Sequence, residues 1–504
     1  MTIHRLVAAL CSWWMFRPIG RVQLNRRTGT WKWSFRPSWQ SPTNTQAIFL
    51  TSVITAVENR TLTKKPTRLI ARTLDNCLFS SGQVEVIDKM STFRGIIEEL
   101  PGISMDRFQE ENRSCSTVFF LSHFHTDHLE GLNTHFFEQL VSKKQYLYCS
   151  PITKTFLRLR YDLIGEQASR IAEITICNPI VVTYRDPSVS NSDVIVTVTA
   201  VPAGHCPGSI MLLFEADRND KKVTVLCTGD FRINREDFSK LKPLHDKVSG
   251  KLVPKAFDNI YLDTTFYNKR FSYFPSRQET LDVIVSDVQE WLGKNDKNHV
   301  FLEISAYYGS EDLFSKLSAA VKKRIHVNLK VQDSYRYIPE LNLYSTENAM
   351  ETRIHACVGK YQRRYLKSDV PLPCKPEVEA QNILTIVPSA QRWADKDLRK
   401  GFIEREARKL YVCYSCHASY NELKEFIDYF KPKKIHPCVV PDIVSKNAWM
   451  AEAKKKITNF EREINYTFLR ASEGAANSLD WDLMEYKSFK KSERTNGDSS
   501  DDDF

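Results

Sequence analysis

The densest group of reactive side chains lies in residues 121–132, whose sequence is LSHFHTDHLEGL. Neutral imidazole and carboxylate groups are ligands for zinc and similar divalent ions. The segment follows an apolar run that predicts a buried strand, and side chains on extended or turning backbone diverge, so the four ligands cannot all bind one ion. In this interpretation His123 and His125 face one ion. Asp127 and His128 face a second ion beside it.

Two later segments place further ligands at predicted strand ends. The turn AGHCPGS places His205 after the apolar run 194–201, and CTGDFR places Asp230 after the run 223–227. Taken singly, each segment could be an ordinary turn. An aspartate at a strand end can bridge two cations with its two carboxylate oxygens, and cations about 3.5–4 Å apart activate water for attack on phosphorus. The ordered set therefore predicts hydrolysis of a phosphodiester.

HFHTDH, AGHCPGS and TGDFR, preceded by SMDRF, resemble the motifs of the metallo-β-lactamase fold. More narrowly, they are similar to its nucleic-acid-processing branch, which carries an inserted β-CASP domain whose markers follow in YLDTTF, RIHAC and CYSCHASY. The resemblance covers about residues 90–468. It implies an α/β fold, an αββα sandwich with an inserted α/β domain. It also implies that Asp106 supports a metal-binding histidine, and that Asp263 and His417 act at the catalytic centre.

The resemblance assigns the active-site ligands as two sets that share one aspartate. One ion would be held by His123, His125, His205 and Asp230, and the other by Asp127, His128, Asp230 and His417. The catalytic residues would be Asp106, Asp127, Asp263 and His417. The implied cofactors are one or two zinc ions at the active site, with Mg or Mn as the alternative at the second position.

A second kind of metal site is predicted in the inserted domain. Two imidazoles and two thiols can close a tetrahedral shell around zinc, and His355 and Cys357 can bind one ion from a single strand. Spacing alone leaves buried structural thiols as an equal alternative. The resemblance favours one structural zinc ion, which in this branch distinguishes end-joining endonucleases from their exonuclease relatives. Its ligands would be His326, His355, Cys357 and Cys374.

Composition restricts the class of protein. A chain of 504 residues predicts two to three domains. Lys and Arg exceed Asp and Glu by 71 to 61, which fits a polyanionic partner but is weak evidence alone. No run of about 18 apolar residues occurs, so we expect no transmembrane helix and no membrane partner. The scattered cysteines lack the regular spacing of a disulfide-rich secreted domain, which favours reduced thiols in the cytosol or nucleus.

The pattern along the chain predicts five segments. These are 1–89, a basic, tryptophan-rich extension of unknown role that is unfolded or a presequence; 90–256, the first part of the sandwich; 257–409, the inserted domain; 410–468, the return segment; and 469–504, a disordered acidic tail.

Runs of β-branched and aromatic residues predict strands at 117–121, 145–149, 194–201, 210–214 and 223–227, and a strand at 260–262 that opens the second section. Within that section we expect helices at 277–292 and 311–321 and strands at 300–304 and 325–327. Strand character returns at about 383. Residues 410–415 are expected to rejoin the first fold type, before an amphipathic helix at 420–430.

The combined prediction is a nuclear, metal-dependent DNA endonuclease that opens hairpins and trims overhangs in double-strand-break repair by end joining, with 5′-exonuclease activity as an addition. Its partner would be DNA at ends, hairpins and junctions between single and double strands. The alternatives are a 5′-exonuclease of interstrand-crosslink repair, an RNA-processing nuclease of the same branch, an inactive DNA-end scaffold and a small-molecule hydrolase. The long tail through which family members dock kinase and ligase partners is not evident.

Charged residues modify this expectation. Thr126 and Glu130 occupy positions where vertebrate end-joining members of the family carry lysines, which predicts weaker local attraction for phosphate. In the inserted domain, a set of basic residues could follow a nucleic-acid backbone, although such runs are more often plain solvated surface. The set is Lys322, Lys323, Arg324, Lys360, Arg363 and Arg364.

Overall fold

The computed structural model describes residues 91–188, 193–218, 220–304, 308–358 and 372–440, together with strands β1 (Gly20–Leu24) and β2 (Trp31–Phe35). The chain divides into two compact units, residues 1–86 and 87–504. In the first unit β1 and β2 pair antiparallel. The predictions for the rest of the extension 1–89, for the end of the return segment and for the tail 469–504 lie outside the described residues.

The second unit contains two sheets that share one core. A parallel four-stranded sheet has the order β3 (Ile103–Met105), β4 (Val118–Phe120), β5 (Leu147–Cys149) and β6 (Ile171–Glu173). A mixed six-stranded sheet has the order β21 (Ile435–Pro437), β13 (Asn259–Leu262), β10 (Lys221–Cys227), β9 (Ile210–Arg218), β8 (Asp193–Pro202) and β7 (Ile180–Arg185).

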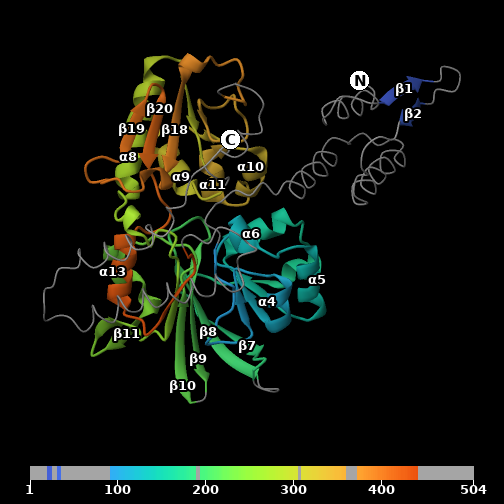
Figure 1. The fold of residues 1–504 in the computed structure, drawn as a ribbon, viewed down its shortest axis with the longest axis vertical. Helices are drawn as coiled ribbons and strands as arrows, with labels where there is room; N and C mark the ends of the chain where they lie inside the picture. The colour runs from blue at the N-terminus through green and yellow to red at the C-terminus, as the bar shows by residue number, and fades with distance from the viewer. Residues whose placement is uncertain are drawn as a thin grey trace, which may run out of the picture. The chain divides into compact units, whose positions relative to one another are not determined.

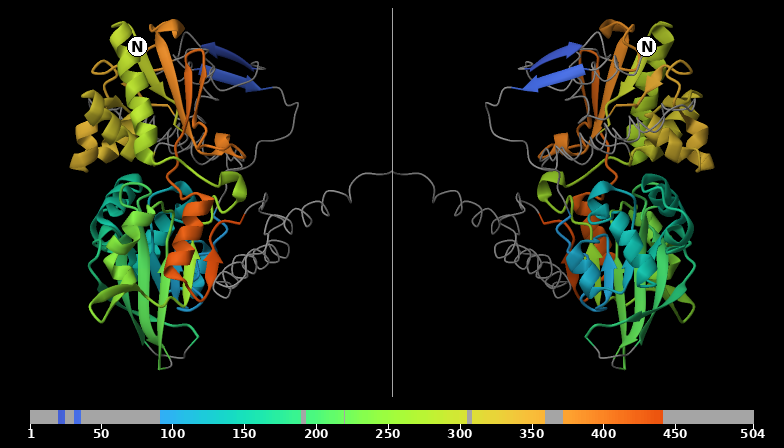
Figure 2. Two further views of the ribbon diagram at one scale, coloured as in Figure 1. Left: turned by 90° about the vertical axis from the view of Figure 1, so that its left-hand side faces the viewer. Right: turned by 90° about the vertical axis from the view of Figure 1, so that its right-hand side faces the viewer.

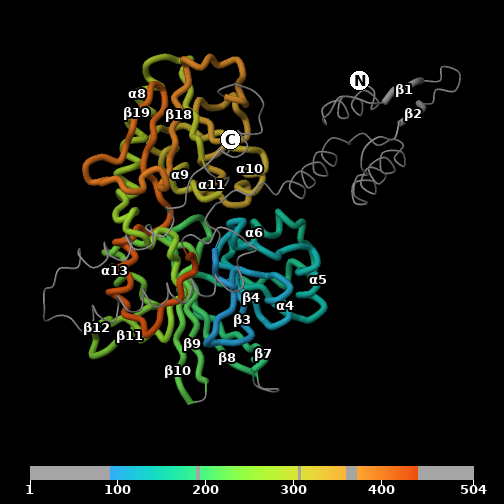
Figure 3. The backbone as a smooth tube through the Cα atoms, in the orientation of Figure 1, coloured from blue at the N-terminus to red at the C-terminus, as the bar shows by residue number. Residues whose placement is uncertain are grey.

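Alternation along β4 shows why these sheets stack. Successive strand residues point to opposite faces. Phe120 points to the six-stranded sheet, where its ring lies 5.0 Å from that of Phe214, while Phe119 points outward to Phe136, 5.1 Å away. The helices on that outer face are α4 (Glu110–Cys115), α5 (Thr134–Ser142), α6 (Pro151–Arg160) and α7 (Gly165–Ser169) (Figure 1; Figure 3).

Helix α13 (Tyr420–Phe430) covers the other outer face. Its Phe426 is fully buried in the cluster that contains Leu213 of β9 and Leu226 of β10. The orange-red helix lies against the green strands in the side views of Figure 2. The predicted αββα sandwich is therefore confirmed.

A third sheet, of seven strands, carries the rest of the described chain. Its order is β16 (Ser345–Thr346), β15 (Ile325–His326), β17 (Ile354–His355), β14 (His299–Leu302), β18 (Ile383–Ser389), β20 (Lys409–Cys413) and β19 (Ile403–Glu406), and only the edge strand β19 runs antiparallel to its neighbour. Its helices are α8 (Arg277–Lys294), α9 (Glu311–Val321), α10 (Leu329–Tyr335) and α11 (Pro339–Tyr344).

Short elements complete the described fold. The 3₁₀ helices are η1 (Thr126–Leu129), η2 (Arg235–Lys240), η3 (Lys242–Leu244), η4 (Lys269–Phe271), η5 (Ala380–Asn382) and η6 (Gln391–Trp393). Strands β11 (His245–Val248) and β12 (Lys251–Pro254) form a hairpin. Within the described ranges, every helix is too short or too polar to cross a lipid bilayer.

Two strand predictions were wrong about the sheet to which the strand belongs. The strand at 260–262 was expected to open the second section, but β13 pairs with β10 in the six-stranded sheet. Residues 410–415 were expected to rejoin the first fold, but β20 pairs with β18 in the seven-stranded sheet. Both strands are largely buried, and an apolar pattern indicates burial but does not identify the partner strand. Helices α9 and α13 have the predicted ends, and the division into domains at the predicted boundaries stays a prediction.

Helix α13 begins with a reciprocal cap, which gives a first test of the fold. Ser419 Oγ accepts from Glu422 N, and Glu422 Oε2 accepts from Ser419 N at 2.7 Å. We expect Ser419→Ala to lower the free energy of unfolding by about 1 kcal/mol, because the backbone N–H of Glu422 loses the Ser419 Oγ that accepts its hydrogen bond. Urea denaturation measures it, with exposed Lys424→Ala on the same helix as the control. Equal stability of the two variants would contradict the assignment.

Candidate metal centre

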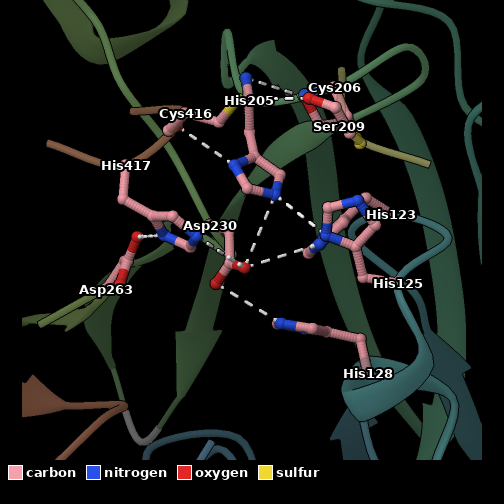
Figure 4. A network of polar contacts seen from close by, with 12 residues as sticks. His123, His125, His128, His205, Cys206, Ser209, Asp230, Asp263, Cys416 and His417 are labelled. Carbon is pink, nitrogen blue, oxygen red and sulfur yellow. Dashed lines mark hydrogen bonds and ion pairs between the residues drawn. The ribbon is translucent and has the colours of Figure 1, made fainter. Parts of the chain in front are cut away.

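The predicted ligands lie where strands end. His123, His125 and Asp127 follow β4, and η1 turns the backbone so that His128 comes back toward the end of that strand. His205 follows β8. Asp230 follows β10, Asp263 follows β13 and His417 follows β20. Figure 4 shows the five histidines meeting around Asp230, with Asp263 beside His417.

Asp230 occupies the middle of the centre (Figure 4). Its Oδ2 lies 3.6 Å from the Nε2 atoms of both His123 and His205. The same oxygen lies 3.8 Å from His417 Nε2, whereas Oδ1 lies 3.3 Å from His128 Nε2. A carboxylate whose two oxygens face different imidazoles has the arrangement that a bridge between two cations requires.

Hydrogen bonds fix which nitrogen of each histidine faces Asp230. Ser122 Oγ lies 2.9 Å from His123 Nδ1, and Asp106 Oδ2 lies 3.0 Å from His128 Nδ1. An acceptor at Nδ1 keeps the proton there, so the lone pair of Nε2 is directed toward the centre. These two histidines are therefore oriented as metal ligands.

In His205 and His417 as well, a hydrogen bond at Nδ1 leaves Nε2 directed toward Asp230. His205 Nδ1 lies 3.0 Å from the carbonyl oxygen of Cys416, and His417 Nδ1 lies 2.8 Å from Asp263 Oδ2. Among the described residues, no hydrogen-bond partner reaches His123 Nε2, although the atom is buried. A buried polar atom without a partner is costly, and a divalent cation would satisfy it. The residues present therefore fit a metal centre.

Asp106 holds the base of this arrangement, at the position predicted for a supporting residue. Its Oδ1 accepts from Ser122 N and its Oδ2 accepts from Ser122 Oγ, both at 2.7 Å. The backbone of Asp106 has a φ of 56°, in the left-handed region that aspartate adopts more readily than most residues other than glycine. Ser122 was missed by the sequence reasoning, because a serine beside a metal ligand carries no signal of its own.

Asp127 and Cys206 differ from the other donors. Asp127 lies at the rim, with 39% of its side chain exposed and its Oδ2 3.7 Å from His128 Nε2. All other predicted active-site ligands belong to groups whose donor atoms lie within 4.8 Å of one another. Cys206 joins the group of His123, His125 and His205, which the sequence reasoning did not anticipate.

Burial and charge divide the histidines into two electrostatic classes. Burial lowers the pKa of His123 and His205 well below the usual value and that of His125 to about 4, so these rings are neutral. Burial also acts on His417, but the carboxylates of Asp263 and Asp230 outweigh it and raise its pKa to about 9. The pKa of His128 is likewise raised by Asp230, Asp127 and Asp106, against the effect of burial. Without cations these two protonated rings balance the carboxylates, and a bound cation would replace their protons.

The predicted structural zinc ligands also converge. His326 and His355 end the neighbouring parallel strands β15 and β17, and their Nδ1 atoms lie 3.2 Å apart. Cys374 Sγ lies 3.4 Å from His355 Nδ1, and the donor atoms of His326, Cys357 and Cys374 lie within 4.8 Å of one another. A hydrogen bond from the Cys357 thiol, with others from the two histidines, lowers the pKa of Cys374 to about 3. A thiolate beside a second cysteine and two imidazoles is a donor set that suits zinc.

His299 completes this second site and was missed by the sequence reasoning. It opens β14, beside β17, and its Nδ1 lies 3.0 Å from His355 Nε2. If His299 Nδ1 accepts the proton of His355 Nε2, the lone pair of His355 Nδ1 is available to bind a zinc ion together with the other donors. A single histidine at a strand start has no distinguishing pattern, so only strand pairing shows the contact.

The basic residues predicted to follow a nucleic-acid backbone are only partly described. Arg324 is engaged by Glu351 at 3.4 Å and by the carbonyl oxygen of Asn342, while Lys322 and Lys323 are exposed. The other three, Lys360, Arg363 and Arg364, lie outside the described residues. Beside the metal centre, Glu130 pairs with Arg107, and its effect on the attraction for phosphate stays a prediction.

Comparisons with known proteins agree on one family. Residues 339–442 match the family model described as DNA repair metallo-beta-lactamase. The chain is similar to "Protein artemis" of Homo sapiens (37% identity over 70% of this chain and 50% of that protein) and of Rattus norvegicus (36%, 70% and 49%). It is also similar to "DNA cross-link repair 1A protein" of Homo sapiens (27%, 67% and 29%). The chain thus spans about half the length of the curated Artemis relatives it matches.

One solved structure to which the chain is similar is BJP-1, a subclass B3 metallo-beta-lactamase of Bradyrhizobium japonicum. It shares 18% identity, with 29% of this chain and 65% of that chain covered and a TM-score of 0.19. This degree of similarity is too low to support a functional comparison.

Because Asp106 holds His128 in place, a substitution at Asp106 should weaken metal binding. We expect Asp106→Asn to weaken zinc binding at the active centre by about 10–100-fold, because an amide lacks the charge that holds His128 and Ser122. Zinc per chain, measured by mass spectrometry after dialysis against graded chelator, gives the result. Asp237→Asn, in an exposed pair with Lys240, is the control. Zinc retention equal to that of the control would remove the supporting role.

The Cys374 thiolate predicts that the second site binds zinc separately. We expect Cys374→Ala to lose one zinc ion per chain and to lower the melting temperature, because a structural zinc site contributes folding energy. The active-centre zinc should remain. Cys177→Ala, at an exposed cysteine, is the control for thiol loss. A variant that keeps its full zinc content would show that Cys374 is an ordinary, partly buried thiol.

Proposed function

Because this chain is an Artemis-like member of the DNA repair metallo-β-lactamase family, we propose that it is a metal-dependent nuclease that hydrolyses phosphodiester bonds in DNA. The observation that supports this most is the placement of Asp230 among four imidazoles, with Oδ2 toward three and Oδ1 toward His128. Two divalent cations at this place would polarise water and stabilise the negative charge that develops on the oxygens around phosphorus.

The protein's own groups prepare that centre. Asp230 would bridge the two metal positions, while His123 and His205 face one of its oxygens with neutral rings. The partly exposed Asp127 lies at the rim, where a ligand can also meet solvent and substrate. The centre is thus rigid at its base and open at one side.

Asp263 has a positioning role in this proposal. It is 2% exposed, and its oxygens accept from Thr265 N at 2.9 Å, from Thr265 Oγ1 at 2.6 Å and from His417 Nδ1 at 2.8 Å. A carboxylate with all these partners is poorly placed to give a proton to a substrate. It would instead hold His417, whose side chain is 24% exposed, at the second metal position.

Within DNA repair, we assign the chain to hairpin opening and overhang trimming during end joining in the nucleus, with DNA ends and junctions as its substrates. The Artemis relatives and the paired-cysteine site in the seven-stranded sheet support this choice. The similarity to the cross-link repair protein keeps 5′-exonuclease action as the second candidate. Purified protein is offered hairpin, overhang and 5′-phosphorylated single-stranded DNA, and cleavage confined to 5′ ends would favour the second candidate.

A substitution at the rim tests the hydrolytic role. We expect Asp127→Asn to lower cleavage at least about 100-fold and to leave DNA affinity nearly unchanged, because the amide removes a charged metal ligand without changing shape. Cleavage kinetics and fluorescence anisotropy with the same hairpin measure the two properties. Asp237→Asn again serves as the matched control. Unchanged turnover would refute the metal role of Asp127, and DNA binding without cleavage by the metal-loaded protein would favour a scaffold.

A further inference from the structure

His125 is held differently from the other histidines of the metal centre. Its Nδ1 faces inward, 3.0 Å from His205 Nε2. Its Nε2 is buried, and no described residue offers it a hydrogen bond. The other four rings each have the outer nitrogen fixed by a serine, a carboxylate or a carbonyl oxygen. Something other than a hydrogen bond to Nε2 must therefore keep the outer side of this ring in place.

The ring of His125 is covered by Gly309, which lies just before α9. A Cβ atom at Gly309 would lie 3.0 Å from His125 Nε2 and 3.1 Å from Cε1, closer than ordinary contact. The φ of Gly309 is 109°, a conformation that residues with side chains rarely adopt. The backbone therefore approaches the imidazole as closely as only glycine permits.

Tyr308 extends this contact along the same loop. Its ring lies 5.6 Å from Phe124, the residue between His123 and His125, and 5.3 Å from Phe156 of α6. Two consecutive residues from the section that carries the seven-stranded sheet thus pack on the His-Phe-His segment of the sandwich.

Two side chains fix the backbone of Gly309. Its N–H donates to Glu311 Oε2 at 2.7 Å, and its carbonyl oxygen accepts from Cys416 Sγ at 3.1 Å. Glu311 is 2% exposed, and its other oxygen accepts from Tyr335 at 2.9 Å. The carbonyl oxygen of Cys416 holds His205, and the next residue is His417.

We propose that Gly309, fixed by Glu311 and Cys416, is a positioning residue for His125: the inserted section sets the orientation of one metal-binding imidazole by packing. This rests on the proposed metal centre. It makes metal binding in the sandwich depend on a loop of the other sheet. Ordinary packing between the two sections would instead affect only stability.

The main test adds a methyl group at this contact. We expect Gly309→Ala to weaken zinc binding at the active centre about 10–100-fold and to lower kcat with little change in KM, because the methyl group displaces the His125 ring. Zinc retention under graded chelator and hairpin cleavage are measured on the full chain. Gly293→Ala, in α8 with open space around its Cβ position, is the matched control.

Cobalt supplies a readout that a purely structural role would not change. With Co²⁺ alone as the probe, Gly309→Ala should alter the visible spectrum of the histidine centre. The thiolate bands of the site with Cys357 and Cys374 should keep their intensity, which shows that the inserted section is folded. An unchanged histidine-centre spectrum together with unchanged zinc retention would overturn the proposal, even if the melting temperature falls.

A milder substitution covers the case in which Gly309→Ala does not fold. Glu311→Gln keeps the shape but has only one oxygen to serve Gly309 N and Tyr335, so we expect a loss of zinc affinity smaller than that of Gly309→Ala. Exposed Glu340→Gln on α11 is the control. Zinc retention equal to that of the control would overturn the proposal. The zinc and cobalt results need no nucleic acid, so absence of DNA cleavage by the wild-type chain would refute the proposed function alone.

Discussion

The carboxylate of Asp230, almost buried among imidazoles, is the constraint on which the rest of the described structure depends. An uncompensated charge in this position is expensive, so the surrounding groups must either be protonated or share a cation. The raised pKa values of His128 and His417 describe the first state, and the neutral His123 and His205 are ready for the second. The hydrogen bonds at the Nδ1 atoms of these four histidines keep their Nε2 atoms directed at Asp230.

The fold meets this constraint by bringing strand ends together. The loop after β4 comes from one sheet, and those after β8, β10 and β13 come from the other, so the centre lies at the edge of the sandwich where these strands end. The last ligand arrives after β20, a strand of the third sheet. The section that carries the third sheet therefore contributes twice to the centre, through the loop after β20 and through the packing of Gly309 on His125.

The two candidate metal sites have different chemistry because they have different surroundings. The active centre uses nitrogen and oxygen donors and has an exposed aspartate at its rim, as a site that must admit substrate and water requires. The second site uses two thiols and two imidazoles within the sheet, and His299 supports one of them from behind. Such a closed set suits an ion that stabilises the fold and takes no part in the reaction.

The sequence alone determined the parts of the site that are local. The spacing of His123, His125 and His128 could be read directly, because ligands that share one loop need no distant partner to be identified. Helices α9 and α13 were predicted to the residue, because amphipathic spacing is also local. The resemblance added Asp106, Asp263 and His417 by motif. Their geometry agrees with those assignments, whereas their roles still await the experiments.

Only the tertiary structure decided which distant groups touch. Ser122, His299 and Gly309 carry no pattern that separates them from ordinary residues, because their importance lies in contacts made across sheets and loops. The sheet to which β13 and β20 belong could not be read either, since a buried strand has the same apolar pattern in any sheet. Sequence reports which side chains prefer burial or metal, whereas pairing and packing depend on the whole chain reaching one arrangement.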